Sequence, residues 1–127
     1  MARVLLIEPD KLLAANLRQA LAKRGHEVIW QTTAQAALVS ADLKVPDIVV
    51  LEPHLALHSG IEFLYEFRSY PDWQTVPVVI YSQVPWEDSG SARAKAELEV
   101  SDFCPKSSTS LAQLADRLEQ ILQPKPA

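Results

Sequence analysis

The sequence predicts an α/β fold in which helices cover both faces of a parallel five-stranded sheet. Five short apolar segments alternate with five segments of helical periodicity, and the connections between them are short. In addition, Ile48–Leu51 is an unbroken apolar run bounded by Pro46-Asp47 and Glu52-Pro53. Such a run is typical of a central strand that is buried on both faces. The periodicity alone does not set the order of the strands.

Each expected strand is short and precedes an expected helix. The strands are Val4–Ile7, Glu27–Trp30, Ile48–Leu51, Val76–Tyr81 and Asp102–Cys104. The helices carry apolar residues at spacings of three and four. They are a first helix with Leu12, Leu13, Leu17, Ala20 and Leu21, then Ala34–Leu43, Ile61–Phe67, Ser91–Leu98 and Leu111–Leu122.

Residues at the expected helix ends support these assignments. Asp10, Thr33 and Ser110 each place a side-chain oxygen where it can accept a free backbone N–H at a helix start. Gly25 is suited to close the first helix, and Tyr70-Pro71 ends the third, because a residue before proline disfavours helical backbone.

The composition fits one globular domain of 127 residues, 48% of them hydrophobic. We expect residues 1–123 to form this domain and residues 124–127 to be a flexible tail. The net charge of −4, without a lysine or arginine cluster, argues against nucleic-acid binding. Cys104 is the single cysteine, so no internal disulfide can form. No signal sequence or run of about 20 apolar residues is present. We therefore expect a cytoplasmic protein without membrane association.

Nucleotide-binding glycine motifs are absent from the chain. Its three glycines are scattered, and neither Gly-x-Gly-x-x-Gly nor a Walker loop occurs. A nucleotide-dependent enzyme therefore has little support, and we expect no catalytic activity and no cofactor.

Several short motifs follow one another along the chain. They are Val4-Leu-Leu-Ile-Glu-Pro-Asp10, Gly25-His-Glu-Val28, Pro46-Asp47, Gly60, Val76-Pro77 and Lys106. Each is weak alone, but in this order the chain resembles the receiver domain of response regulators over nearly its whole length. The resemblance implies a flavodoxin-like fold with strand order 2-1-3-4-5. It also implies a site formed by Glu8, Glu52, Ser82 and Lys106.

Two residues depart from the pattern of that family at the phosphate-accepting and Mg²⁺-binding positions. The family accepts phosphate on an aspartate, and Glu52 stands at this position. The second acid of the family's Mg²⁺ pocket aligns with Pro9, which has no side-chain oxygen. Glutamate carries its carboxylate about 1.5 Å further out, and an error of about 1 Å can cost roughly 100-fold in the rate of in-line transfer. Glu8, Pro9 and Asp10 thus form a degenerate acidic pocket, for which we expect no metal.

Some of these residues also have a purely structural interpretation. Asp10 is more often a helix cap than a ligand, and a strand-end hydroxyl such as that of Ser82 commonly satisfies local backbone. His54 and His58 lie near Glu52 in the sequence, but they fall in a loop and not on one helix face. We therefore do not expect a transition-metal site there.

Four further residues are assigned to packing or to loop geometry. Cys104 is expected in the core, and Trp73 and Trp86 are expected to pack within loops. Ser107 follows Lys106 where the family usually has a proline, so the peptide bond between them should be trans.

Three functions are consistent with this sequence. The first is a pseudo-receiver, a phosphorylation-independent protein–protein interaction module in signal transduction. The second is a working receiver domain of a two-component phosphorelay that accepts phosphate inefficiently on Glu52. The third is a flavodoxin-like enzyme with Glu52 and Lys106 as acid and base, which requires a substrate-sized pocket between them. We favour the first because Glu52 and Pro9 remove two independent parts of the transfer machinery.

The resemblance also implies a switch formed by Ser82 and Phe103. Serine leaves more room for a ring than threonine does, and phenylalanine has no hydroxyl to hold it in water. Burying the ring is therefore expected to gain about 2 kcal/mol. We expect Phe103 to point inward and to fix the face formed by the fourth helix, the fifth strand and the last helix. The expected partner there is a kinase, a phosphotransfer protein or an effector, or a second copy in a homodimer.

Overall fold

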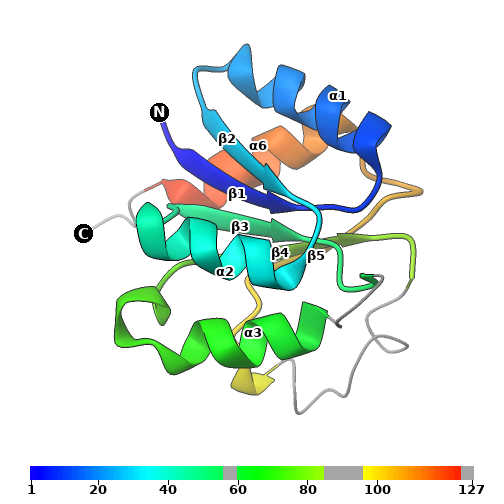
Figure 1. Ribbon diagram of the computed structural model, residues 1–127. Helices are drawn as coiled ribbons and strands as arrows, with labels where there is room; N and C mark the ends of the chain where they lie inside the picture. Colours follow the sequence, from blue (N-terminus) through cyan, green and yellow to red (C-terminus); the bar gives the residue numbers. More distant parts are fainter. Residues whose placement is uncertain (56–59, 85–95, 124–127) are drawn as a thin grey trace.

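The computed structural model describes residues 1–55, 60–84 and 96–123 of the chain. They form one parallel sheet with the strand order β2-β1-β3-β4-β5, which confirms the fold that the resemblance implied (Figure 1). The strands are β1 (Arg3–Ile7), β2 (Glu27–Gln31), β3 (Ile48–Leu51), β4 (Val78–Ser82) and β5 (Asp102–Pro105). The helical elements are α1 (Lys11–Ala22), α2 (Ala34–Leu43), α3 (Gly60–Ser69), the 3₁₀ turn η1 (Pro71–Trp73) and α6 (Leu111–Leu122).

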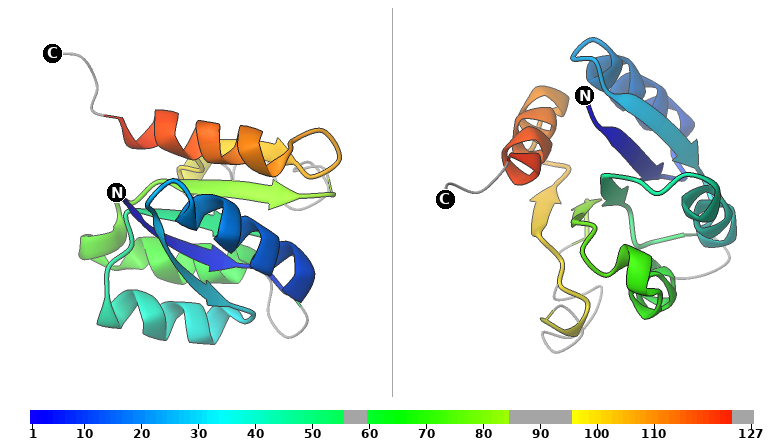
Figure 2. Two further views of the ribbon diagram at one scale, coloured as in Figure 1. Left: turned by 90° about the horizontal axis from the view of Figure 1, so that it is seen from above. Right: turned by 90° about the vertical axis from the view of Figure 1, so that its left-hand side faces the viewer.

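The helices form two layers, with α1 and α6 on one face of the sheet and α2 and α3 on the other (Figure 2). Alternate residues of each strand point to opposite faces, so β1 contributes to two separate cores. Leu5 and Ile7 belong to the core under α2 and α3, whereas Val4 and Leu6 belong to the core under α1 and α6. The central strand β3 is fully buried, as its apolar sequence predicted.

The predicted caps are present in the structure. The Asp10 carboxylate accepts the backbone N–H groups of Leu12 and Leu13, and Thr33 caps α2. Ser110 and Gln113 form a reciprocal capping box at the start of α6. Gly25 has a φ of +86°, which suits glycine in the turn after α1.

The observed strand bounds differ slightly from the predicted ones. The predicted fourth strand began at Val76, but β4 begins at Val78 because Pro77 has no N–H to donate to the ladder. Pro77 still contributes its carbonyl oxygen, which accepts the N–H of Val49 at 2.9 Å. Residues 91–95 of the predicted fourth helix, His58, Trp86 and the predicted tail at 124–127 lie outside the described residues.

Arg68, near the end of α3, connects segments that are distant in the sequence. Its guanidinium donates to the carbonyl oxygen of Leu98 at 2.9 Å, of Trp73 at 2.8 Å and of Val76 at 2.7 Å. Trp73 is buried and stacks on Phe67 with 5.0 Å between ring centroids, which confirms its predicted packing role. These contacts tie η1, the residues just before β4 and the residues just before β5 to α3.

Candidate functional site

The candidate site lies at the carboxyl ends of four adjacent strands. Glu8 follows β1, Glu52 follows β3, Ser82 ends β4 and Lys106 follows β5. The strand order β1-β3-β4-β5 places these residues side by side at one edge of the sheet, which is where ligands bind in open α/β folds. Glu8 is 2% exposed, Glu52 8% and Ser82 0%, so the polar groups are enclosed and not solvated.

Lys106 joins the two carboxylates. Its ammonium nitrogen, Nζ, lies 2.7 Å from Oε1 of Glu8 and 3.0 Å from Oε1 of Glu52. The side chain of Lys106 is 12% exposed. The lysine backbone is held as well, because its N–H donates to the carbonyl oxygen of Ser82 at 3.0 Å. The peptide bond from Lys106 to Ser107 is trans, as predicted.

The other carboxylate oxygens are occupied by local donors. Oε2 of Glu8 accepts the backbone N–H of Asp10 at 3.1 Å. Oε2 of Glu52 accepts the backbone N–H of His54 at 3.2 Å and lies 3.2 Å from Nδ1 of the His54 ring. All four carboxylate oxygens therefore have a partner within the chain. These bonds offset the desolvation cost of Glu52 and part of the desolvation cost of Glu8, as buried polar groups require.

The pKa values of the three groups shift in different directions. Burial raises the pKa of Glu8 above its usual value, although Lys106 and the N–H of Asp10 act against this. Burial acts in the same sense on Glu52, but hydrogen bonds from Lys106, the N–H of His54 and Ser82 together bring its pKa below the usual value. Burial lowers the pKa of Lys106, but its bonds to Glu8 and Glu52 more than compensate and raise it. Lys106 is therefore a permanent cation at neutral pH.

The donor set does not fit the Mg²⁺ ion that the resemblance implies. Mg²⁺ requires near-octahedral oxygen coordination. Pro9 offers no side-chain oxygen, and Asp10 uses Oδ1 to cap α1 by accepting from Leu12 and Leu13. Oε1 of Glu8 and Oε1 of Glu52 already contact the ammonium group of Lys106. Within the described residues, no group of three or more acidic, histidine or cysteine side chains is arranged to hold a metal ion.

The structure brings together most of the predicted site residues and separates others. Glu8, Glu52, Ser82 and Lys106 share one cluster, whereas Asp10 acts as the helix cap that was expected of it. The hydroxyl of Ser82 also accepts the backbone N–H of Val84 at 3.2 Å. Elsewhere on the sheet, Cys104 is buried, as predicted.

Phe103 is half-buried and packs against the core that lies under α2 and α3. The Phe103 ring is therefore not free in solvent. Its role in a switch stays a prediction.

Two neighbours of the cluster were not among its predicted members: His54, which was considered only for a metal site, and Tyr81. His54 contacts Glu52 through both its backbone and its ring, and the signal for it was the short spacing of two residues. The ring centroid of Tyr81 lies 5.8 Å from the Lys106 ammonium, within cation–π range. Tyr81 was expected only as a strand residue, since nothing in the sequence relates it to Lys106.

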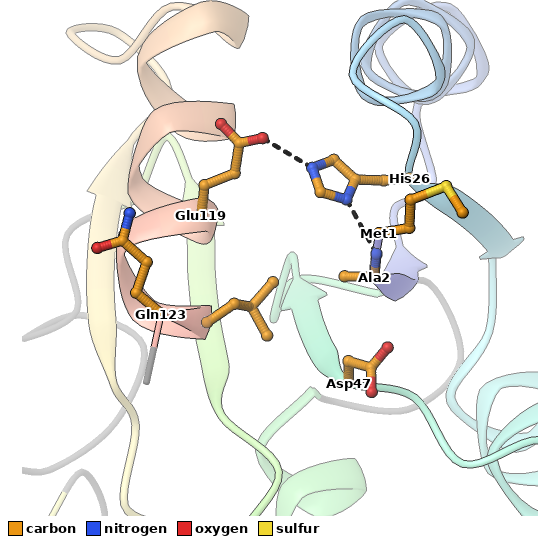
Figure 3. Close-up of a pocket in the computed structure, with 7 residues that line it drawn as sticks. Met1, Ala2, His26, Asp47, Glu119 and Gln123 are labelled. Carbon is orange, nitrogen blue, oxygen red and sulfur yellow. Dashed lines mark hydrogen bonds and ion pairs between the residues drawn. The ribbon is translucent and has the colours of Figure 1, made fainter. Parts of the chain in front are cut away.

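A cavity of about 620 Å³ lies at the opposite, amino-terminal edge of the sheet. Met1, Ala2, His26 and Asp47 line one side, and Glu119 of α6 and Gln123, which follows α6, line the other (Figure 3). His26 bridges the two sides. Its Nδ1 accepts the N–H of Ala2 at 3.1 Å, and its Nε2 lies 2.9 Å from Glu119. This cavity is separate from the cluster of Glu8, Glu52 and Lys106.

Comparison with known families places this site in context. A model of the response regulator receiver domain matches residues 4–119. The KDP operon transcriptional regulatory protein KdpE of Escherichia coli strain K12 is 34% identical over 82 residues, which are 65% of this chain and 35% of that protein. The match thus spans about a third of that relative's length.

Solved structures agree with the fold. The receiver domain of HemR from Leptospira biflexa in its non-phosphorylated form has a TM-score of 0.82 at 22% identity. The comparison covers 100% of this chain and 98% of that one. The chemotaxis response regulator CheY4 of Vibrio cholerae has a TM-score of 0.84 at 17% identity, covering 95% and 98% of the two chains. In the described ranges, no helix is long and apolar enough to span a bilayer.

Proposed function

The chain belongs to the response regulator receiver domain family, and from this membership we propose that it is a phosphorylation-independent member. In this proposal it acts as a protein–protein interaction module in two-component signal transduction. The observation that carries the proposal is the double ion pair of Lys106 with Glu8 and Glu52, at 2.7 and 3.0 Å.

Phosphoryl transfer depends on positioning and on electrostatic stabilisation of the transferred group. A phosphate on Glu52 would have to take Lys106 from the two carboxylates that it contacts. It would also displace His54 from Oε2 of Glu52 or accept a strained geometry. Glu8 would then remain buried beside the added negative charge. No Mg²⁺ ion would balance that charge, because Pro9 replaces the acid that would help to bind the ion. Each of these changes raises the barrier to phosphorylation.

The direct contact between Glu52 and Lys106 also argues against the enzyme hypothesis. Their side chains lie 3.0 Å apart, so there is no substrate-sized space between the two charged groups. In this geometry the two groups form an ion pair with each other and are not positioned to exchange a proton with a substrate.

In this proposal the chain signals through a partner-binding surface whose conformation does not change with phosphorylation. We place this surface on the predicted fourth helix (Ser91–Leu98), β5 and α6, with the half-buried Phe103 ring as its anchor. Residues 91–95 of that face lie outside the described residues. Its partner is a cytosolic kinase, phosphotransfer protein or effector, or a second copy of the chain. If Glu52→Ala and Phe103→Ala both bind the partner, or self-associate, as the parent does, the constant-face account is wrong.

The phosphorylation test is an intact-mass measurement after incubation with acetyl phosphate and Mg²⁺. We expect no added phosphate on the parent chain. The matched gain-of-function variant carries Glu52→Asp and Pro9→Asp, which restore the acceptor and the missing acid, and we expect this variant to gain one phosphate. A one-phosphate shift on the parent that Glu52→Gln abolishes would instead establish the inefficient receiver.

A further inference from the structure

The cavity at the amino-terminal edge of the sheet has the size of a small-molecule site. Its volume of about 620 Å³ falls within the range of roughly 300–1,000 Å³ that such sites occupy. An adjoining hollow of about 250 Å³ shares Met1, Ala2 and Asp47 with it, so Asp47 lies between two open spaces. The cavity joins the start of β1, the residue before β3 and the end of α6, and a ligand there would contact all three segments.

Two of the polar groups that line the cavity are already paired with each other. Nδ1 of His26 accepts the N–H of Ala2 at 3.1 Å, and a backbone N–H can only donate, so Nδ1 carries no proton. The proton of the neutral ring therefore lies on Nε2, which donates to Glu119 at 2.9 Å. The other oxygen of Glu119 pairs with Arg24 at 2.7 Å. His26 thus adds no positive charge to the cavity, and both oxygens of Glu119 have a partner.

Asp47 is the lining acid that keeps an open oxygen, and it lies apart from the pair of His26 and Glu119 (Figure 3). Its Oδ2 accepts the backbone N–H of Arg3 at 2.7 Å, and its own N–H donates to the Arg3 carbonyl oxygen at 2.8 Å. These two bonds fix the carboxylate beside β1. The Arg3 guanidinium is directed elsewhere and pairs with Glu27 at 3.2 Å. In the part of the chain that the structure describes, Asp47 has no ion pair, and its Oδ1 is open to a cation.

The end of α6 favours a cation at the same place. The last carbonyl groups of a helix carry partial negative charge, which attracts cations. Helix α6 has no basic residue in its last turn, and the side-chain amide of Gln123 makes no hydrogen bond to another described residue. Leu122 and Ala2 supply apolar lining, and the unbranched side chain of the exposed Met1 can adjust to a bound molecule. The cavity therefore combines negative groups with apolar surface.

We propose that this cavity binds a small organic cation, in which a primary ammonium or guanidinium group is joined to a short apolar body. The charged group contacts Oδ1 of Asp47 and the carboxyl end of α6, and the apolar body packs on Leu122. Charge-assisted hydrogen bonds of this kind are stronger than neutral ones. An anion would be repelled by Asp47 and by the helix end. Among the described residues, no group of three or more acidic, histidine or cysteine side chains is arranged to hold a metal ion there. The cavity lies at the opposite edge of the sheet from the Glu8–Glu52–Lys106 cluster, so this proposal is independent of the phosphorylation proposal.

The test uses three probes of similar shape, namely phenethylamine, the neutral phenethyl alcohol and the anionic hydrocinnamate. Binding is followed by amide chemical shifts of the labelled chain. We expect phenethylamine to bind saturably with a Kd of about 1 mM, which a ligand of about nine non-hydrogen atoms can reach. The shifts should be confined to the start of β1, to Asp47 and its neighbours, and to the end of α6. Phenethyl alcohol should bind more weakly, and hydrocinnamate at least about tenfold more weakly than the amine.

One pair of variants identifies the carboxylate. Asp47→Asn keeps an oxygen for the N–H of Arg3 and removes the charge. We expect it to weaken phenethylamine binding about tenfold and to leave the binding of phenethyl alcohol unchanged. Asp116→Asn is the matched control, because Asp116 is an exposed acid of α6 that does not line the cavity. This variant should bind phenethylamine within about twofold of the parent.

A second pair of variants leaves the contacts of Asp47 intact. Gln123→Lys puts a cation at an exposed position of the cavity wall, where it competes with the ligand, and should weaken phenethylamine binding at least about tenfold. Gln120→Lys adds the same charge at an exposed residue of α6 that does not line the cavity, and should bind within about twofold of the parent.

Several results would overturn the proposal. These are the absence of saturable phenethylamine binding, binding of hydrocinnamate as tight as that of the amine, and shifts centred on another part of the molecule. Binding of phenethylamine by Asp47→Asn or by Gln123→Lys as tight as by the parent would overturn it as well.

Discussion

Replacing Lys106 with methionine keeps the length of the side chain and removes the ammonium that both Glu8 and Glu52 contact. The two carboxylates then face each other in a site where they are 2% and 8% exposed. Removing one partner of a buried ion pair typically costs about 3–5 kcal/mol of folding free energy. Protonation limits this cost. With an ordinary pKa near 4.5, neutralising one carboxylate costs about 3.4 kcal/mol at pH 7 but only about 0.7 kcal/mol at pH 5.

We therefore expect Lys106→Met to lower the free energy of unfolding by about 3 kcal/mol at pH 7 and by about 1 kcal/mol at pH 5. The sign follows from proton linkage. Without the lysine, the folded state raises the pKa of the carboxylates above their unfolded values, so stability is lost as pH rises through the folded pKa. The raised pKa of Lys106 in the parent adds stability at both pH values, since both lie far below its ordinary value.

The assay is urea unfolding followed by tryptophan fluorescence, to which the buried Trp73 contributes. Lys44→Met is the control, because Lys44 is 59% exposed and lies 3.8 Å from Glu27, and its loss should cost less than about 0.5 kcal/mol. A loss below about 1 kcal/mol at pH 7 for Lys106→Met, or an equal loss at both pH values, would refute this account of the cluster.

Three further results are expected. Titration with Mg²⁺, followed by amide chemical shifts, should show no saturable binding in the low-millimolar range. Saturation below about 1 mM would mean that Glu8 and Glu52 hold the ion in spite of Lys106. Phe103→Ala should lower the free energy of unfolding by about 2 kcal/mol because the ring packs on the core. Tyr65→Ala is the control, since the Tyr65 ring is exposed and its loss should lower the free energy of unfolding by less than about 0.5 kcal/mol. Arg68→Met should lower the free energy of unfolding by about 3 kcal/mol, since several backbone carbonyls lose their donor. Arg18→Met, at an exposed position, is its control, and equal effects of the two would mean that the carbonyl contacts are not stabilising.

The sequence by itself determined the architecture of the domain. The apolar run of β3 and the alternation of strands with helices predicted a parallel sheet, because burial on both faces and helical periodicity leave direct marks in the sequence. Caps such as Asp10 and Ser110 were predictable for the same reason, since their partners lie within three residues. The location of the site followed from the rule that the carboxyl ends of parallel strands meet at one edge.

The tertiary structure decided how the residues at that edge contact one another. Glu8, Glu52 and Lys106 are far apart in the sequence, and which oxygen meets the ammonium depends on strand register and side-chain rotamers that no local pattern encodes. The same holds for Arg68, whose partners at Leu98 and Glu99 lie about thirty residues away. Short-range interactions can be predicted from local sequence patterns. The charge balance of the buried cluster, in contrast, arises only when the folded sheet brings Glu8, Glu52 and Lys106 into contact.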